Sequence, residues 1–377
     1  MKIFVPADKD TSETRVSLMP ADSERLIKLG AEIEAQAGLG QSVNINDKQY
    51  EAVGVKISKD NESSFSGAQI ILRINSPDNQ DIQNLSEGCI HISFLDPFNN
   101  HDVIKKFIKK KISGISLEMI PRTTIAQKMD VLSSQANLAG YVAVVLSAER
   151  LKKIFPMMMT AAGTISPVRV FVIGAGVAGL QAIATAKRLG ARVDAFDVRP
   201  EAQEQIISLG ARPLKIDIAQ NEKTKDGYAK QLSNEQLEKQ RLAMTKQCAS
   251  SDIVITTAKV FGKKAPLIVT NKMLDEMKPG SVVVDLAVDT GGNVEASENN
   301  KEIVRNGVTI IGFPELQRQV PVTASQMFSS NLYNFIEHFW DKENKSFRLN
   351  MEDEILKSCL ITHNGQIVNQ QIKEITK

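Results

Sequence analysis

The sequence predicts an α/β protein with two domains, each built on a parallel sheet and separated by a cleft. Short apolar runs alternate with segments of helical period along most of the chain, the pattern of strands joined by helical crossovers. After a long helical segment the alternation begins again at Val168. The length of 377 residues also exceeds what one hydrophobic core usually serves.

The first domain is expected to hold strands near residues 2–7, 32–37, 69–74, 89–95 and 111–119. Segments such as "PADSERLIKLG" and "NHDVIKKFIKK" have helical period and lie between these strands. Residues 130–153 predict one long helix that leads out of this domain. The following residues, 155–167, predict a loop whose three methionines fill gaps in a core.

The second domain is expected to be a doubly wound sheet with strands at 168–173, 192–196, 213–217, 252–256, 281–285 and 308–311. A long amphipathic helix should follow at 324–340, and the strand-like tail from Ser346 should return to the first domain. The predicted domains are therefore 1–132 with 323–377, and 133–322.

Composition narrows the class of protein. The chain is 42% hydrophobic and 24% charged with a net charge of +2, which does not indicate a nucleic-acid or membrane-surface partner. Its three cysteines are isolated and form no zinc spacing, so we expect no metal site and a reducing compartment. We also expect no secretory signal and no membrane span, since no uncharged apolar run reaches ~18 residues.

The stretch "FVIGAGVAGL", residues 171–180, carries the clearest functional pattern. Gly174, Gly176 and Gly179 have the G-x-G-x-x-G spacing between a predicted strand and a predicted helix. The first glycine permits a tight turn, the second lets a pyrophosphate approach the backbone, and the third lets the helix pack on the strand. The helix N-terminus then offers N–H donors to the phosphates, which indicates a Rossmann dinucleotide-binding fold.

An acidic residue stands where such a fold binds the adenosine ribose. Asp197 ends the second strand, 18 residues after Gly179, and would accept hydrogen bonds from the ribose hydroxyls. Its charge would repel a 2′-phosphate and favours NAD over NADP, although Arg199 nearby could accommodate that phosphate. The alternative is a structural glycine turn with an exposed aspartate. The remaining predicted contacts of this region are Ala175, Val177 and Val198.

Several longer stretches resemble one family over nearly the whole chain. They are "ETRVSLMP", "PRTTIAQKMDVLSSQANLAGY", "FPMMMTAAGT", "GAGVAGLQAIATAKRLGA", "FDVRP", "DGYAK" and "DLAVDTGGN". Together they closely resemble the soluble NAD(H)-binding component of proton-translocating NAD(P) transhydrogenases with a split α subunit.

The resemblance implies NAD(H) bound on this chain and NADP(H) bound on a partner subunit. It implies hydride transfer from NADH to NADP⁺, with Re/Si specificity favoured over Si specificity. It also implies a homodimer in the cytoplasm, held at the inner membrane by NADP-binding and membrane-spanning subunits that carry out proton translocation.

The family segment R-x-x-x-x-Q-x-x-D-x-x-S matches Arg122, Gln127, Asp130 and Ser133. The resemblance implies that Arg122 lies on the nicotinamide, that Asp130 and Ser133 orient it, and that Gln127 reaches the other nucleotide's ribose. Holding two rings at reacting distance is the contribution such groups make to hydride transfer. From the residues alone, Arg122 and Asp130 would be a charge pair at a helix start, with Asp130 near the cap.

The polar segment 217–250 is longer than a simple crossover and predicts a mobile loop. The resemblance implies that Tyr228, after Gly227, closes over bound nucleotide and that Gln240 contacts it. A solvated surface excursion is the alternative. Lys259 is expected near the nucleotide, although its identity is atypical of the family.

Two other functions remain open. The chain also resembles alanine dehydrogenases, whose pattern Arg15 and Asp289 match, but Asn75 and Asp96 stand where that family has a substrate lysine and a histidine. Reductive amination needs proton transfer, whereas hydride transfer between two nicotinamides needs no general acid or base. The third possibility is a catalytically silent NAD-responsive regulator.

Overall fold

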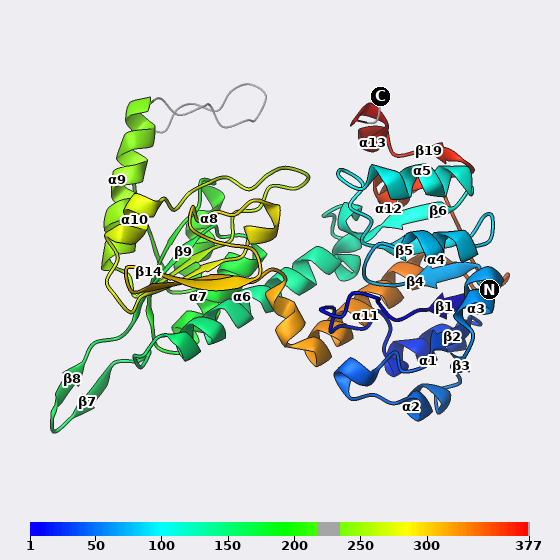
Figure 1. Ribbon diagram of the computed structural model, residues 1–377, viewed down its shortest axis with the longest axis horizontal. Coiled ribbons are helices and arrows are strands. Elements are labelled where there is room, and N and C mark those ends of the chain that lie inside the picture. The colour runs from blue at the N-terminus through cyan, green and yellow to red at the C-terminus, as the bar shows by residue number, and fades with distance from the viewer. Residues whose placement is uncertain (217–233, 376–377) are drawn as a thin grey trace. The chain divides into compact units, whose positions relative to one another are not determined.

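The computed structural model describes residues 1–216 and 234–375. The chain divides into two compact units: unit 1 consists of Met1–Gln135 with Gln317–Lys377, and unit 2 consists of Ala136–Leu316. Gly227 and Tyr228 lie outside the described residues. Each unit has its own sheet, and Figure 1 labels many of the strands and helices.

Unit 1 contains a mixed sheet in the order β19-β18-β6-β5-β4-β1-β2-β3. Its strands are β1 (Lys2–Val5), β2 (Glu32–Gln36), β3 (Lys56–Ser58), β4 (Ile70–Leu72), β5 (Ile90–Ser93), β6 (Ser113–Ser116), β18 (Leu360–His363) and β19 (Gln366–Ile367). The strands β1 to β6 pair in parallel, whereas β18 runs antiparallel to β6. The C-terminal tail thus completes the sheet of the first unit.

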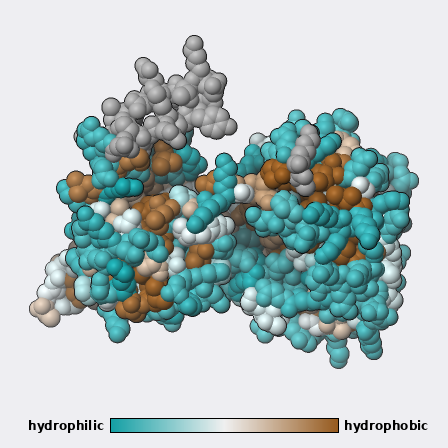
Figure 2. Space-filling view, turned by 45° about the horizontal axis from the view of Figure 1, so that its top comes forward, coloured by the Kyte–Doolittle hydropathy of each residue, from teal (hydrophilic) through white to brown (hydrophobic). Residues whose placement is uncertain are grey.

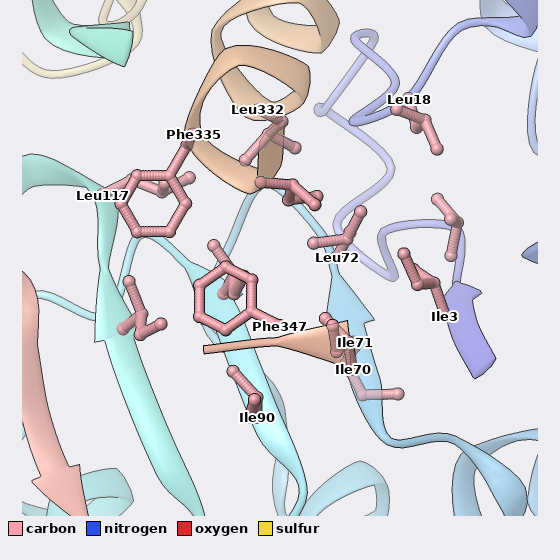
Figure 3. Close-up of a cluster of buried hydrophobic side chains, with 14 of the residues drawn as sticks. Ile3, Leu18, Ile70, Ile71, Leu72, Ile90, Leu117, Leu332, Phe335 and Phe347 are labelled. Atoms are coloured by element: carbon pink, nitrogen blue, oxygen red, sulfur yellow. The ribbon is translucent and has the colours of Figure 1, made fainter. Parts of the chain in front are cut away.

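Helices enclose this sheet, and its central strands β4 and β5 are buried along their whole length. They are α1 (Pro20–Lys28), α2 (Asp47–Glu51), α3 (Asn61–Gly67), α4 (Asn79–Asn84), α5 (His101–Lys109), α11 (Pro321–His338), α12 (Glu354–Cys359) and α13 (Gln370–Ile375). Figure 3 shows how residues distant in sequence form one core, with Ile70 and Ile90 from the sheet near Phe335 of α11 and Phe347. A further strand pair, β16 (Trp340–Asp341) and β17 (Ser346–Phe347), follows α11.

Unit 2 is a doubly wound sheet in the order β11-β10-β9-β12-β13-β15-β14. Its strands are β9 (Arg169–Ile173), β10 (Arg192–Phe196), β11 (Arg212–Pro213), β12 (Ile253–Thr256), β13 (Val282–Asp285), β14 (Lys301–Arg305) and β15 (Val308–Gly312). All pair in parallel except β14, which is antiparallel to β15. The winding reverses between β9 and β12, where open α/β sheets bind their ligands.

The helices of unit 2 are α7 (Val177–Arg188), α8 (Glu201–Ser208), α9 (Asn234–Ser250) and α10 (Asn271–Asp275). The long helix α6 (Val131–Arg150) begins in unit 1 and continues into unit 2. Gly140 of α6 packs so closely on α7 that a Cβ there would lie 2.1 Å from the carbonyl oxygen of Ala178. The glycine therefore lets α6 approach the helix that follows the glycine-rich turn.

Two expectations about residues 155–167 were wrong. The predicted loop 155–167 contains a hairpin of β7 (Met158–Thr160) and β8 (Gly163–Ile165), which extends away from the rest of unit 2 (Figure 1). Its methionines do not fill a core, because Met159 is 74% exposed. Contacts within the chain divide the two units at 135/136 and 316/317, compared with the expected 132/133 and 322/323, and Phe328, Leu332 and Phe335 of α11 pack in the core of unit 1.

By length and composition alone, helix α6 could cross a membrane. No segment of this kind was expected from the sequence. Of the apolar window of α6, 56% is buried inside the structure, and the core helix of a soluble protein passes the same test. On the visible face, the surface of both units is mainly hydrophilic with scattered apolar patches (Figure 2).

Candidate nucleotide-binding site

The glycine-rich turn lies at the carboxyl end of β9, where the strand passes into α7. Gly174 has a φ of +95°, and a Cβ there would lie 2.5 Å from Oγ1 of Thr257. A Cβ on Gly179 would lie 1.8 Å from the carbonyl oxygen of Gly174. These two glycines are therefore required by the fold itself.

Gly176 differs from its neighbours. Its φ of −76° is ordinary for any residue, and a Cβ there would meet no atom within 4 Å. The fold does not need glycine at this position, so the open space beside it fits a group from outside the chain. A pyrophosphate bound at the N-terminus of α7 is the expected occupant of such a space.

Asp197, directly after β10, is tied to the same turn. Its Oδ2 accepts a hydrogen bond from the backbone N–H of Ala175 at 2.7 Å. Its Oδ1 accepts from the backbone N–H of Arg199 at 2.9 Å and from Nε of Arg199 at 3.0 Å. Burial acts to raise the pKa of this carboxyl, but the bonds from Arg199 and Ala175 hold it below its ordinary value.

The other predicted cofactor contacts in unit 2 differ in how exposed their side chains are. Val198 is 77% exposed, Val177 is half-buried at the first turn of α7, and Gln240 is half-buried on α9. Lys259 follows β12 and pairs with Asp289, with Nζ 2.7 Å from Oδ1. The structure thus places the glycine turn, Asp197 and Lys259 at the carboxyl ends of β9, β10 and β12.

The segment from Arg122 to Ser133 belongs to unit 1, where it leads into the first turn of α6. Asp130 stands before α6 and caps it, since its Oδ1 accepts from the backbone N–H of Ser133 at 2.9 Å and its Oδ2 from Oγ of Ser133 at 2.6 Å. Arg122 and Gln127 are exposed. Among the described residues no ion pair joins Arg122 to Asp130, so the helix-start charge pair does not form.

This segment is fastened to α11. The carbonyl oxygen of Lys128 accepts hydrogen bonds from Nδ2 of Asn331 at 2.8 Å and Nδ2 of Asn334 at 3.2 Å. Oγ of Ser134 donates to Oδ1 of Asn331 at 2.7 Å. The backbone that presents Gln127 and Asp130 is therefore fixed to α11 by these three hydrogen bonds.

A buried polar cluster in unit 1 surrounds Arg15. Its Nε and Nη2 donate to the two carboxylate oxygens of Glu13 at 2.7 and 2.6 Å, and both side chains are fully buried. Nη1 of Arg15 donates to Gln135 at 3.1 Å, and Nδ2 of Asn75 donates to Oε2 of Glu13 at 3.2 Å. Burial acts to raise the pKa of Glu13, but Arg15 and Arg318 hold it below its ordinary value.

The two positions where alanine dehydrogenases have a substrate lysine and a histidine hold neither residue type. Asn75 lies in the Arg15 cluster as an uncharged amide. Asp96 is exposed, with a φ of +47°, and its carboxylate accepts from Nδ2 of Asn99 at 2.9 Å. His91, five residues before Asp96, is buried against Phe107 and hydrogen-bonds to Ser93.

Two buried carboxylates, Glu13 in unit 1 and Asp285 in unit 2, were not predicted from the sequence. Glu13 precedes Arg15 by two residues in "SETR", and this spacing was its one visible signal. Asp285 ends the apolar run "SVVVD" of β13, a position where a fully buried acid needs several donors. Among residues 1–216 and 234–375, no group of His, Cys, Asp or Glu side chains is arranged to hold a metal ion.

Comparison with known proteins agrees with this arrangement. The family described as "Alanine dehydrogenase/PNT, N-terminal domain" matches residues 4–139, and its C-terminal domain matches residues 143–370. The chain belongs to the alanine dehydrogenase/PNT family. The first part of the NAD(P) transhydrogenase subunit alpha from Rickettsia prowazekii is 42% identical over 99% of this chain and 98% of its own length.

The family has two branches, and identity differs between them. An alanine dehydrogenase from Halomonas elongata is 26% identical over 99% of this chain and 96% of its own length. The solved structure of a transhydrogenase from Sinorhizobium meliloti is 41% identical and superposes with a TM-score of 0.87, covering 98% of this chain and all of that one (100%). Within the family the chain is thus more similar to the transhydrogenases, as its motifs led us to expect.

Proposed function

We propose that this chain is the NAD(H)-binding component of a proton-translocating NAD(P)⁺ transhydrogenase, with Re/Si specificity. Identity with transhydrogenase α subunits along the whole chain supports this function. The observation that carries the choice over alanine dehydrogenase is the hydrogen bond from Asn75 to Glu13. It puts an uncharged amide, which cannot act as a general acid or base, beside Arg15 at the position where the dehydrogenase pattern has its substrate lysine.

NADH bound at the glycine-rich turn would supply the hydride. The backbone N–H groups at the start of α7 hold the pyrophosphate, and Gly176 leaves space for it. Asp197 accepts hydrogen bonds from the adenosine ribose and disfavours a 2′-phosphate. Arg199 donates to Asp197 with Nε 3.0 Å from Oδ1, so its guanidinium would have to give up this ion pair to bind a 2′-phosphate.

The residues that border the nicotinamide are proposed from the family pattern and the rigid backbone that carries them. Arg122 contacts the ring, Asp130 and Ser133 orient its carboxamide, and Gln127 reaches the ribose of NADP(H) on the partner subunit. The cap formed by Asp130 and Ser133 supports these roles, because it locks both side chains in one rotamer. The remaining proposed cofactor contacts are Ala175, Val177, Val198, Gly227, Tyr228, Gln240 and Lys259.

The chain is proposed to work as a homodimer in the cytoplasm, joined to the inner membrane through the membrane-spanning and NADP-binding subunits. The β7–β8 hairpin supports self-association, since Met157, Met159 and Ile165 are 61%, 74% and 48% exposed. Apolar side chains that a single chain leaves in water are typical of a surface that another chain covers.

The test is hydride exchange between NADH and an NADP⁺ analogue, measured on the purified chain mixed with a transhydrogenase NADP-binding domain. Exchange that requires both proteins supports the proposal. Oxidation of NADH by pyruvate and ammonia at a comparable rate, with no exchange, would replace it with the alanine dehydrogenase function. Tight NADH binding with neither reaction would indicate the regulator.

A further inference from the structure

An ion pair links the two loops that leave the centre of the nucleotide sheet. Nζ of Lys259 lies 2.7 Å from Oδ1 and 2.8 Å from Oδ2 of Asp289. Lys259 follows β12, and Asp289 lies in the short helix η4 (Val288–Thr290) after β13. Since β12 and β13 are adjacent parallel strands, with Thr256 opposite Asp285, the pair spans their shared carboxyl edge.

Both ends of this pair are anchored in the fold by one buried acid. Asp285 is fully buried, and its Oδ1 accepts from the backbone N–H of Ala287 at 2.9 Å. Its Oδ2 accepts from the backbone N–H of Asn293 at 2.9 Å and from Oγ of Ser297 at 2.7 Å. These bonds shape the loop that carries Asp289.

Asn293 connects this loop to the loop that carries Lys259. Its Oδ1 accepts from the backbone N–H of Ala258 at 2.9 Å, and its Nδ2 donates to the carbonyl oxygen of Ala258 at 2.9 Å. Ala258 directly precedes Lys259. The two charges therefore stand on backbones joined to one buried network, unlike a pair of freely moving surface side chains.

The position of the pair identifies which part of a dinucleotide it faces. Asp197 after β10 marks the adenosine half of the sheet, so the half built from β12 and β13 receives the nicotinamide. Oγ1 of Thr257, in the Lys259 loop, donates to the carbonyl oxygen of Gly174 at 3.0 Å. The loop that carries the lysine is thus in contact with the turn that holds the pyrophosphate.

We propose that the Lys259–Asp289 pair balances charge beside the nicotinamide ring and so sets the relative affinity of the site for oxidised and reduced nucleotide. This inference rests on the proposed nucleotide site and adds a specificity role to it. The ring of NAD⁺ is positively charged and that of NADH is neutral, so a lone cation beside it disfavours NAD⁺ and a lone anion favours it. When the two side chains are paired they present little net charge to the ring, so they change the relative affinity for NAD⁺ and NADH little.

The experiment measures the dissociation constants of NADH and NAD⁺ by calorimetry on the full-length chain, at low ionic strength. In Asp289→Asn the ratio Kd(NAD⁺)/Kd(NADH) should rise by about threefold to tenfold, because Lys259 is left unpaired. In Lys259→Met the ratio should fall by a similar factor. The double variant should return to within about twofold of the parent, since both charges are gone.

Lys263→Met is the matched control, because Lys263 is an exposed lysine of the same loop with no ion pair to Asp289. Its ratio should equal that of the parent. Thermal unfolding verifies that each variant is folded, and Lys259→Gln replaces Lys259→Met if the latter does not fold.

Single variants whose ratios stay unchanged, or move in the same direction, overturn the inference while nucleotide binding itself stands. Failure of the parent chain to bind either nucleotide overturns the proposed function, and this inference with it. The opposite signs distinguish a charge effect from local disorder, which would weaken binding of both nucleotides together.

Discussion

Gly179 approaches Gly174 so closely that a Cβ on Gly179 would lie 1.8 Å from the carbonyl oxygen of Gly174. That carbonyl is also held by Oγ1 of Thr257 at 3.0 Å, so the turn cannot move aside without breaking this bond. Gly179→Ala should therefore lower the free energy of unfolding by more than about 2 kcal/mol. Chemical denaturation would measure this, and a variant as stable as the parent would contradict the observed packing.

Gly176→Ala is the counterpart of that substitution. Its methyl group would meet no protein atom within 4 Å and its φ of −76° is unstrained, so stability should change by less than about 1 kcal/mol. The methyl would, however, occupy the space proposed for the pyrophosphate, and NADH affinity should fall at least tenfold. Normal affinity measured by calorimetry would mean that the phosphates bind elsewhere.

Arg122→Ala should slow hydride exchange by at least about tenfold, because loss of a positioning group misplaces the reacting ring. Arg122 is exposed, so stability should not change, and binding of the adenosine half should stay within about twofold of the parent. Stopped-flow exchange with an NADP analogue and titration with ADP give the two readouts.

Lys128→Ala is the control for this experiment, since Lys128 also has an exposed cationic side chain on the same segment. Its exchange rate should match the parent. Equal slowing in both variants would indicate a general loss of positive charge and would remove the specific role of Arg122.

Asp197 links stability to pH in a direction set by its lowered pKa. A carboxyl whose pKa is lower in the folded chain stabilises it above the unfolded value, about 4, and this stabilisation is lost as pH falls towards the folded value. The parent should thus exceed Asp197→Asn in unfolding free energy by a margin that is constant above about pH 5 and shrinks below about pH 4. Urea titrations across that range test this, and a margin independent of pH would contradict it.

Removing the charge of Glu13 alone should be far more damaging than removing both partners of its pair. Glu13→Gln leaves the buried guanidinium of Arg15 without its bidentate partner, a loss of about 3–5 kcal/mol. The double variant Glu13→Gln, Arg15→Met removes both buried charges and should recover part of that loss. Additive losses in denaturation experiments would show that the two side chains do not act as a unit.

Met159→Glu tests the proposed homodimer. The methionine is 74% exposed in one chain, so a glutamate there costs the isolated subunit little but would be buried in an interface. Sedimentation should show dimers of the parent and a shift to monomers in the variant. An unchanged dimer would place the interface away from the hairpin.

Much of the fold followed from local pattern. The apolar runs of β9, β12 and β13 are short and continuous, as buried parallel strands require, and their predicted limits agree with the structure to within a residue or so. The glycine spacing likewise predicted the turn at Gly174. Strand β14 was missed because its alternation is that of an exposed edge and its pairing with β15 is a non-local contact.

The exposure of the methionines could not be predicted for a related reason. Met158 and Met159 are apolar, and composition indicates burial; only the pairing of β7 with β8 puts them on a hairpin that the rest of unit 2 does not cover. By contrast, the place of Asp130 near a helix start predicted a cap, which its bonds to Ser133 form, whereas the expected charge pair with Arg122 is absent and Arg122 is exposed.

The sequence by itself determined the α/β class, the glycine turn with its acid at Asp197, and the family, because each depends on residue types at short, fixed spacings. Only the tertiary structure decided that Arg15 is neutralised by Glu13 and that Lys259 pairs with Asp289. The physical reason is that a charge's chemistry depends on which groups lie within a few ångströms of it. Partners such as Lys259 and Asp289 become neighbours only when separate strands align in one sheet.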